Sequence, residues 1–234
     1  MRGVYCRAAR AGRTGSTMDF ERARFNMVEQ QIRPWDVLDR TVLTLMECAP
    51  RDAFVPGEYR RLAYADIAVP IGEGEVMLPP RVEGRLLQAL DLDADDRVLE
   101  IGTGTGFLTF LLAQRAAHVT SVEIRPGFAD RARANLEAQR VGNVTVEVGD
   151  GRRGLEGGAP YDAIVVGGSL PVPEPAFEAQ LAIGGRLFVV IGSAPAMEAM
   201  LVRRTGQNEW VRESLFETTL PPLAGSEAPR RFVL

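Results

Sequence analysis

Histidine and cysteine are scarce in this sequence, and their scarcity argues against several kinds of active site. The chain of 234 residues has one histidine, His118, and two cysteines, Cys6 and Cys48. A serine–histidine–aspartate triad needs a histidine beside its nucleophile, and zinc sites usually take several histidine or cysteine ligands. Two cysteines without a CxxC spacing form neither a disulfide framework nor a metal site. We therefore expect a metal-free protein of a reducing compartment, the cytoplasm.

Long apolar runs and an excess of basic charge are also missing. No apolar stretch approaches the roughly 20 residues that span a bilayer. The formal net charge is −4, and the arginines are spread along the chain instead of being clustered. Such a charge attracts neither nucleic acid nor an anionic membrane, so we expect neither as a partner. Hydrophobic residues make up 46% of the chain, which is enough for the core of one large domain.

The N-terminal segment, residues 1–17, differs from the rest because it is basic and contains no acid. It lacks the apolar stretch of roughly 7–15 residues that a secretory signal needs, although a basic targeting peptide stays open. A patterned helix begins after Met18. We therefore expect residues 1–17 to be a disordered tail or an over-extended start.

Residues 18–80 read as a helical cap followed by loops. Pro34 should end the first helix, because the residue before a proline disfavours helical backbone. We expect Asp36 to cap the second helix and Pro80 to open the third, in whose first turn a proline is tolerated. Residues 50–80 are otherwise loop-rich. The expected helices cover residues 19–33, 36–49 and 80–90.

Residues 81–234 alternate short apolar strands with helices, which predicts one ligand-binding domain around a parallel α/β sheet. A turn signal, Gly206-Gln207-Asn208, separates two stretches within residues 197–219. We expect these stretches to form a terminal antiparallel hairpin on the sheet. The expected strands cover residues 97–102, 118–124, 144–150, 161–168 and 185–192, and the expected helices between them cover residues 107–116, 128–140 and 175–181.

The stretch VLEIGTGTG, residues 98–106, carries the clearest chemistry. A strand here runs into a glycine-rich turn and a helix, which lets the backbone approach a ligand closely. Glu100 stands where dinucleotide-binding turns typically have an apolar residue, and a carboxylate directed at the turn suits a cationic ligand. S-adenosylmethionine carries an ammonium and a sulfonium group and fits this requirement. The residues of the motif expected to bind it are Glu100, Ile101, Gly102, Thr103, Gly104 and Gly106.

Acidic residues also stand at the ends of the next two expected strands. Glu123, followed by Ile124, occupies the place of an acid that takes both ribose hydroxyls. Asp150, followed by Gly151, is placed to hydrogen-bond the adenine amine. The plainer alternatives are a solvated acid at Glu123 and a simple turn at Asp150. Because open α/β sheets bind ligands at the carboxyl ends of their strands, the three features together predict a Rossmann-like, class I S-adenosylmethionine-dependent methyltransferase fold.

At this point the chain resembles the protein-L-isoaspartate O-methyltransferases, from about residue 20 to about residue 220. The glycine-rich motif is generic, whereas its combination with AYADIAVPIGEG upstream is specific to this family. The resemblance implies methyl transfer from S-adenosylmethionine, leaving S-adenosylhomocysteine, to the α-carboxylate of L-isoaspartyl residues in damaged proteins or peptides. The ester would collapse to a succinimide that hydrolyses partly back to aspartate. The matching stretches are MVEQQI (27–32), PRDAFVP (50–56), AYADIAVPIGEG (63–74), VLEIGTGTGF (98–107), NVTVEVGDG (143–151), APYDAIVV (159–166) and QLAIGGRL (180–187).

One loop departs from the family pattern. The family loop between cofactor and substrate usually reads PIG-G-QTIS-P, whereas residues 70–80 read PIGEGEVMLPP. Val76 and Leu78 stand at the threonine and serine positions, so both hydroxyls are missing and no catalytic residue is identified. A carboxylate nucleophile needs donors that hold it in line with the sulfonium. Glu75, at the glutamine position, adds a negative charge that we expect to repel an anionic substrate.

Three functions therefore remain open at the level of sequence. The chain is a repair methyltransferase of reduced activity, a methyltransferase for a less polar substrate, or a cofactor-binding protein without catalysis. Ser169 follows two glycines where the family commonly has Thr-Ala-Ala, and its hydroxyl is a candidate replacement donor. Arg33 is a candidate for binding a substrate carboxylate. A loop serine and a helix-end arginine are the plainer interpretations of these two residues.

Overall fold

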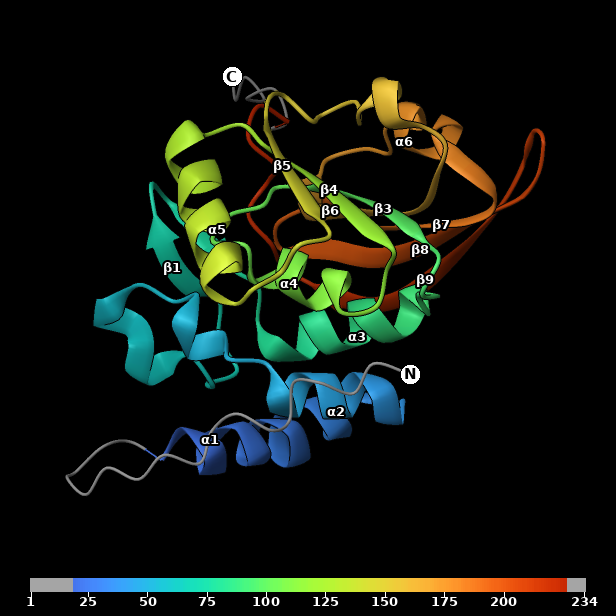
Figure 1. Ribbon diagram of the computed structural model, residues 1–234. Coiled ribbons are helices and arrows are strands. Elements are labelled where there is room, and N and C mark those ends of the chain that lie inside the picture. Colours follow the sequence, from blue (N-terminus) through green and yellow to red (C-terminus); the bar gives the residue numbers. More distant parts are fainter. Residues whose placement is uncertain (1–18, 227–234) are drawn as a thin grey trace, which may run out of the picture.

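The computed structural model describes residues 19–226, and the tail expected over residues 1–17 lies outside them. A seven-stranded sheet forms the centre, with helices on both of its faces (Figure 1). Its strands are β3 (Arg97–Ile101), β4 (His118–Glu123), β5 (Val144–Val148), β6 (Tyr161–Leu170), β7 (Leu181–Ser193), β8 (Ala196–Gly206) and β9 (Glu209–Thr218). The order across the sheet is β5-β4-β3-β6-β7-β8-β9. The first five strands in this order are parallel and the last two are antiparallel, which confirms the predicted fold class and its terminal hairpin.

The remaining elements build the cap and cover the sheet. A small two-stranded sheet, formed by β1 (Val69–Gly72) and β2 (Glu75–Met77), stands apart from the central one. The α-helices are α1 (Phe20–Met27), α2 (Arg40–Cys48), α3 (Pro80–Leu90), α4 (Phe107–Ala113), α5 (Pro126–Ala138) and α6 (Pro175–Ala179). The short helical turns are η2 (Val28–Ile32), η3 (Arg33–Trp35), η4 (Arg51–Ala53), η5 (Gly57–Leu62) and η6 (Glu156–Gly158).

The start of α2 differs from the expectation. Asp39 caps this helix, because its side chain accepts hydrogen bonds from the backbone N–H of Thr41 at 2.7 Å and of Val42 at 2.9 Å. Asp36, the expected cap, has a left-handed backbone with φ of 56° and ends η3. Pro34 lies inside the first turn of η3, where its missing N–H costs no hydrogen bond. The short helical turn η3 therefore separates the first helical segment from α2, which begins later than expected.

The two faces of the sheet pack into two apolar cores. Neighbouring residues of β3 enter different cores, because side chains alternate along a strand and a parallel sheet is covered on both faces. Val98 belongs to the larger core, which also holds residues of α3, α4 and the cap helices. Leu99 belongs to the smaller core, which holds Phe177 of α6. The cap is thus continuous with the main core: α2 lies beside α3, and α1 packs against α2 (Figure 1).

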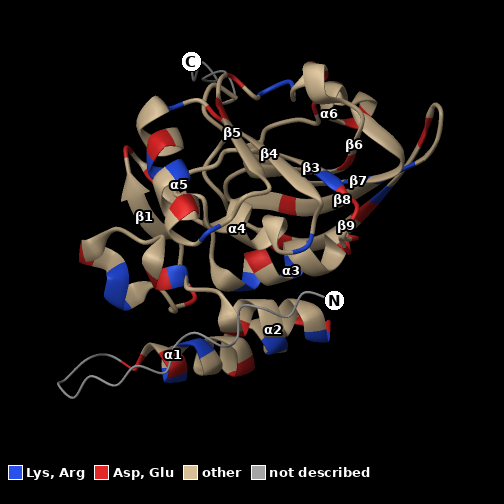
Figure 2. Ribbon diagram, in the orientation of Figure 1, with Lys and Arg blue, Asp and Glu red and all other residues tan. Residues whose placement is uncertain are grey.

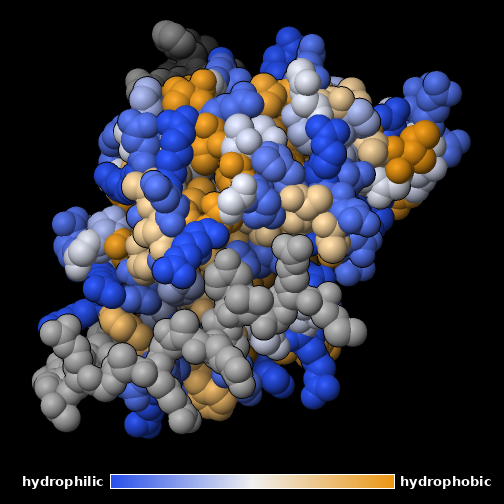
Figure 3. Space-filling view, in the orientation of Figure 1, coloured by the Kyte–Doolittle hydropathy of each residue, from blue (hydrophilic) through white to orange (hydrophobic). Residues whose placement is uncertain are grey.

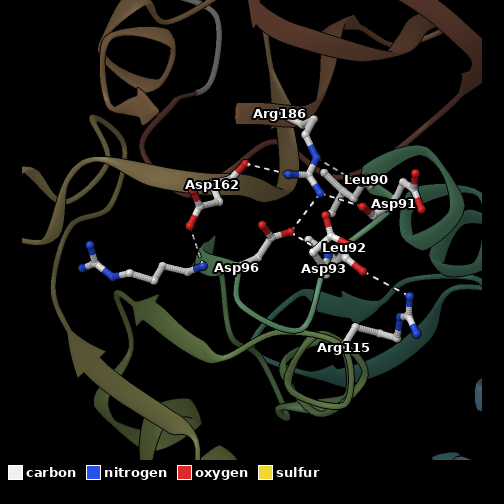
Figure 4. A network of polar contacts seen from close by, with 9 residues as sticks. Leu90, Asp91, Leu92, Asp93, Asp96, Arg115, Asp162 and Arg186 are labelled. Atoms are coloured by element: carbon white, nitrogen blue, oxygen red, sulfur yellow. Dashed lines mark hydrogen bonds and ion pairs between the residues drawn. The ribbon is translucent and has the colours of Figure 1, made fainter. Parts of the chain in front are cut away.

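A buried arginine fixes the amino ends of the strands (Figure 4). Arg186 of β7 donates to the carbonyl oxygens of Leu90 at 2.7 Å and Asp91 at 2.6 Å, and to the Asp96 carboxylate at 2.8 Å. The network therefore joins the end of α3 to the start of β3. A buried guanidinium is tolerated when its donors are satisfied in this way. The carboxyl end of β3, where the glycine-rich turn begins, lies at the opposite edge.

The surface carries charges of both signs and apolar side chains in several places. Acidic and basic residues both occur on α1, α2 and α5 (Figure 2). Apolar side chains gather over the region of α5 and β5 (Figure 3), where Leu136, Val144 and Val146 line a shallow hollow. Within residues 19–226, no helix is long and apolar enough to cross a lipid bilayer.

Candidate active site

A cavity opens at the carboxyl ends of the parallel strands, beneath the β1–β2 hairpin. Its walls come from the hairpin, from the ends of β3, β4 and β6, from the turns that follow β4 and β5, and from a segment near the end of the described chain. The lining residues are Ile71, Glu75, Val76, Leu78, Ile101, Gly102, Gly104, Val122, Glu123, Ile124, Arg125, Phe128, Asp150, Gly151, Arg152, Gly167, Gly168, Pro221, Pro222, Leu223 and Ala224. The expected sites on three successive strands therefore meet in one place.

The glycine-rich turn has a backbone that only glycine adopts readily. Gly102, Gly104 and Gly106 have φ values of 90°, 55° and 87°, in the left-handed region that side chains disfavour. A Cβ on Gly106 would also lie 3.2 Å from the Cβ of Ala132 in α5. Gly102 and Gly104 line the cavity, whereas Gly106 allows α4 to start close against α5.

Glu123 joins the end of β4 to the glycine-rich turn. One carboxylate oxygen accepts from the backbone N–H of Gly104 at 2.9 Å, and the other accepts from the backbone N–H of Arg125 at 3.0 Å. The residue is 4% exposed and lines the cavity. These bonds fix the position and charge of the carboxylate, in the place where the sequence predicts a ribose-binding acid. Ile124, beside it, is exposed and lines the same cavity.

Glu100 lies beneath the turn instead of facing the cavity. It is fully buried, and one oxygen accepts from the hydroxyls of Thr109 at 2.5 Å and Ser121 at 2.6 Å. Its other oxygen has no partner among the described residues. Burial raises the pKa of Glu100 to about 7. Thr103 lies in the same layer, with its hydroxyl 2.6 Å from that of Ser121, and lines a small pocket beside the cavity. A role for Glu100 in cofactor binding stays a prediction.

Asp150 stands at the outer end of the cavity. Its carboxylate accepts hydrogen bonds from the Arg152 side chain, with the shortest at 2.7 Å, and this pairing lowers the pKa of Asp150. Gly151 packs tightly, because a Cβ there would lie 2.9 Å from side-chain atoms of Ile101. Asp150 and Gly151 both line the cavity, so the structure brings them together with Glu123 as the spacing predicted.

Two arginines hold the β1–β2 hairpin over the cavity. Arg125 pairs with Glu75 at 2.8 Å and with Glu73 at 3.2 Å. Arg131 of α5 donates to the backbone oxygen of Ile71 at 2.9 Å. Glu75 therefore stands opposite a cation, and its charge is not the uncompensated one that the sequence suggested.

The hairpin presents an apolar surface to the cavity. Val76 and Leu78 both line it, and Met77 is buried with its sulfur 3.8 Å from the Thr105 hydroxyl. No residue of the hairpin carries a hydroxyl. That this wall departs from the family pattern stays a prediction.

The two candidate donors from outside the hairpin do not reach the cavity. Ser169 is 1% exposed, and its hydroxyl donates to the backbone oxygen of Leu220 at 3.1 Å. Arg33 pairs with Glu29 at 2.9 Å on the helix surface. Close packing explains why glycines precede Ser169. A Cβ on Gly167 would lie 3.0 Å from the Ile101 oxygen, and a Cβ on Gly168 would lie 2.9 Å from the Leu223 nitrogen.

The sequence did not indicate three other contributors to the cavity wall. Arg125, Arg152 and the segment 221–224 line the cavity, but none belongs to a recognisable motif. The segment reaches the site through backbone hydrogen bonds of 2.9 Å between Ser169 and both Pro221 and Leu223. Only tertiary contacts bring these residues together. In the described part of the chain, no group of three or more His, Cys, Asp or Glu side chains could hold a metal ion.

Known proteins support the same assignment of the fold. The sequence model of the family described as "Protein-L-isoaspartate(D-aspartate) O-methyltransferase (PCMT)" matches residues 22–228. A solved structure described as a protein-L-isoaspartate O-methyltransferase superimposes with a TM-score of 0.73 at 25% identity, covering 87% of this chain and 66% of its own. This chain thus spans just under two thirds of that protein. A Plasmodium falciparum structure, described as a candidate protein-L-isoaspartate O-methyltransferase in complex with S-adenosyl-L-homocysteine, shares the fold with a TM-score of 0.70 at 18% identity, covering 86% of this chain and 97% of its own.

Relatives by sequence cover most of the chain. Protein-L-isoaspartate O-methyltransferase 1 of Rhodopseudomonas palustris (strain HaA2) is 42% identical over 209 residues, which are 89% of this chain and 85% of that protein. Protein-L-isoaspartate O-methyltransferase of Methanoculleus marisnigri is 44% identical over 192 residues, which are 81% of this chain and 87% of that protein. The chain therefore belongs to the protein-L-isoaspartate(D-aspartate) O-methyltransferase family.

Proposed function

We propose that the protein transfers a methyl group from S-adenosylmethionine to the free α-carboxylate of L-isoaspartyl residues in damaged proteins or peptides. The observation that carries this proposal is the cavity in which the glycine-rich turn, Glu123 and the family-specific hairpin meet. Relatives that share about 40% of the sequence are named for this activity. The neighbouring Plasmodium falciparum structure contains S-adenosyl-L-homocysteine, the product of such a transfer.

The cavity suits S-adenosylmethionine. The left-handed glycines leave space for the ligand beside Gly102 and Gly104, and no Cβ fills it. Glu123 offers a fixed carboxylate for the ribose hydroxyls, and Asp150 with Gly151 offers polar groups for the adenine. When bound, the cofactor supplies an electrophilic methyl group on a positively charged sulfur.

The chain's own residues have a limited chemical task. A carboxylate is already ionised at neutral pH and needs no general base, so binding and orientation account for most of the catalysis. Val76 and Leu78 line the side of the cavity where the methyl acceptor would bind, here called the acceptor side, and their side chains donate no hydrogen bond. The loss of one well-placed donor costs on the order of 10²–10³ in rate at an electrostatic site. We therefore expect a slow enzyme for isoaspartyl substrates.

The apolar wall also favours a second candidate function. A less polar acceptor would lose fewer hydrogen bonds to water on entering beside Val76 and Leu78. The protein would then be a methyltransferase of this family with a different substrate. A protein that binds the cofactor without catalysis is the remaining alternative. The cytoplasmic location and the absence of nucleic-acid and membrane partners stay predictions.

One experiment separates these functions. Labelled methyl transfer from S-adenosylmethionine is measured with an isoaspartyl peptide and with the matched aspartyl peptide, and cofactor binding is measured by calorimetry on the same preparation. Base-labile label on the isoaspartyl peptide alone supports the repair activity. Cofactor binding without transfer to either peptide contradicts it and directs the search to another acceptor or to a role without catalysis.

A further inference from the structure

A buried ion pair lies directly under the apolar hairpin. Arg51 of η4 and Glu83 of α3 have side chains that are 0% and 1% exposed, and they form an ion pair. The same guanidinium donates to the backbone oxygen of Leu78 at 2.5 Å. Its central carbon lies 4.9 Å from the centre of the Phe107 ring. Arg51 therefore fixes both the carboxylate of Glu83 and the end of the hairpin.

Glu83 lines a small pocket beside the cavity, and the two share wall residues such as Ile71 and Gly102. The small pocket is enclosed by hairpin residues, by the glycine-rich turn and by the start of α4, including Val76, Leu78, Gly104 and Phe107. Among the described residues that line it, Glu83 is the one with a charged side chain. Apart from this carboxylate and the hydroxyls of Thr103 and Thr105, its lining side chains are apolar.

One oxygen of Glu83 is left without a partner. Arg51 pairs with Oε2, whereas Oε1 is buried and accepts no hydrogen bond from any described residue. Burial raises the pKa of Glu83 to about 6, although Arg51 acts in the opposite direction. A buried acceptor with an unused lone pair is uncommon in folded proteins and calls for a donor. Arg51 Nε, a donor of the same ion pair, is also buried and unpartnered, and it makes no hydrogen bond to Oε1. Since Glu83 lines the small pocket beside the cavity, a ligand that enters this pocket is a source of the donor.

We propose that Glu83 is a substrate-binding residue, whose Oε1 accepts a hydrogen bond from the amide N–H of the isoaspartyl residue. This inference rests on the proposed function. In an L-isoaspartyl residue, the amide nitrogen and the methyl-accepting carboxylate are attached to the same Cα. One hydrogen bond to that N–H therefore restricts where the carboxylate points.

The negative charge on Oε1 of the Glu83 carboxylate determines which way the substrate carboxylate points. Arg51 compensates the charge of Glu83 as a whole, but Oε1, the oxygen that Arg51 does not contact, still attracts an N–H and disfavours a carboxylate oxygen beside it. The acceptor carboxylate is then directed away from Glu83 and towards the glycine-rich turn, where the methyl group would lie. A hydrogen bond from the substrate backbone thus takes over part of the orienting task of the missing loop hydroxyls.

The test compares two modified peptides and two variants. The first peptide is N-methylated at the isoaspartyl amide and so lacks the donor, and the second is N-methylated at an amide two residues away. Glu83→Gln keeps an oxygen for Arg51 and turns a donor amide towards the cavity. Asp96→Asn is the matched control, because Asp96 is also a buried carboxylate paired with an arginine, Arg186, at the opposite end of the sheet.

The wild-type protein should use the first peptide on the order of 10–100-fold less efficiently than the second in kcat/KM, as expected for a hydrogen bond to a charged group. Glu83→Gln should reduce this ratio to about threefold or less and leave the cofactor Kd unchanged. Asp96→Asn should keep the wild-type ratio. A role of Glu83 in folding alone would lower thermal stability without changing the ratio.

Two results would overturn the inference. Equal use of the two N-methylated peptides by the wild-type protein is the first, and it needs no variant to fold. An undiminished ratio in Glu83→Gln is the second. Failure of the proposed function has a different signature, namely no transfer to the unmodified isoaspartyl peptide, and the assignment of Glu83 falls with it.

Discussion

The two sides of the active-site cavity are built on different principles. The cofactor side is held by side-chain-to-backbone bonds between successive strand ends, such as those that Glu123 makes with the backbone of Gly104 and Arg125. The acceptor side is held by long-range side-chain contacts, such as that between Arg125 and Glu75. The two sides therefore depend on different contacts, so that a substitution can change one side and leave the other in place. Variants that affect only one side test this separation.

The largest effect is expected at Glu123. In Glu123→Gln, one of the two backbone N–H groups loses its acceptor, and the ribose hydroxyls lose a charged one. We expect the cofactor Kd to rise on the order of 10²–10³-fold, measured by calorimetry. Asp162→Asn, at the amino end of β6, is the control, because its carboxylate accepts from the Arg97 N–H far from the cavity. An unchanged Kd in Glu123→Gln would remove Glu123 from the cofactor site.

The next effect is the pH dependence of stability that comes from Glu100, beneath the glycine-rich turn. Burial raises the pKa of Glu100 from an ordinary value of 4.5 to about 7, so the folded protein binds a proton more tightly than the unfolded chain does. This contribution to stability is fully present below about pH 4.5 and is lost as the pH rises through about 7. It amounts to on the order of 3 kcal/mol.

Glu100→Gln removes the titrating group and should flatten this part of the pH dependence. The free energy of unfolding is measured by urea denaturation between pH 5 and pH 8 in both proteins. Glu83, whose pKa is raised to about 6, contributes a fall of the same sign at lower pH in both. If the free energy of unfolding depends on pH in the same way in wild type and Glu100→Gln, the raised pKa of Glu100 is contradicted.

A smaller effect is expected when the acceptor side is returned to the family pattern. In the double variant Val76→Thr, Leu78→Ser, two hydroxyls can donate to the acceptor carboxylate. We expect isoaspartyl methylation to rise about tenfold in kcat, with the cofactor Kd within about twofold of wild type. Transfer of label to an isoaspartyl peptide gives the rate. If methylation and cofactor binding both stay constant, the hairpin does not contact the acceptor.

The smallest effect is expected at Arg125, which connects the two sides. Arg125→Gln removes the ion pairs to Glu73 and Glu75, which are partly exposed and therefore weak. We expect the KM for an isoaspartyl peptide to rise about threefold, because Glu75 then faces the anionic substrate unpaired. The difference should shrink in high salt, which screens the repulsion. Arg133→Gln, on the outer part of α5, should leave this KM unchanged.

The sequence predicted that Glu123, Asp150 and the glycine-rich turn meet in one place, as they do in the cavity wall, because their signals are local. A glycine-rich turn and an acid at the end of the next strand need only the order of elements to be placed together. The hydrogen bond between Glu123 and Gly104 follows from that order. The direction of the Glu100 side chain was harder to predict. Near the end of a strand, that direction depends on which residues pack against the strand from below.

The acceptor side could not be predicted in the same way. Arg51 and Glu83 come from separate elements and meet only after the cap has packed against α3 and α4. Arg125 neutralises Glu75 across a similar separation in sequence. Even the local error at Asp36 has this origin, since the oxygen of its backbone accepts from Gln88 of α3 at 2.9 Å. Contacts between residues that are far apart in the chain leave no recognisable motif in the sequence.

The segment 221–223, which forms one wall of the cavity, also determines when during synthesis the binding site can be completed. Pro221, Pro222 and Leu223 form one wall, and they leave the ribosome long after the glycine-rich turn at residues 102–106 has emerged. A nascent chain can therefore assemble most of its sheet while the binding site is still open on one side. Translation that stops before this segment would yield a protein that folds in large part but holds its cofactor poorly.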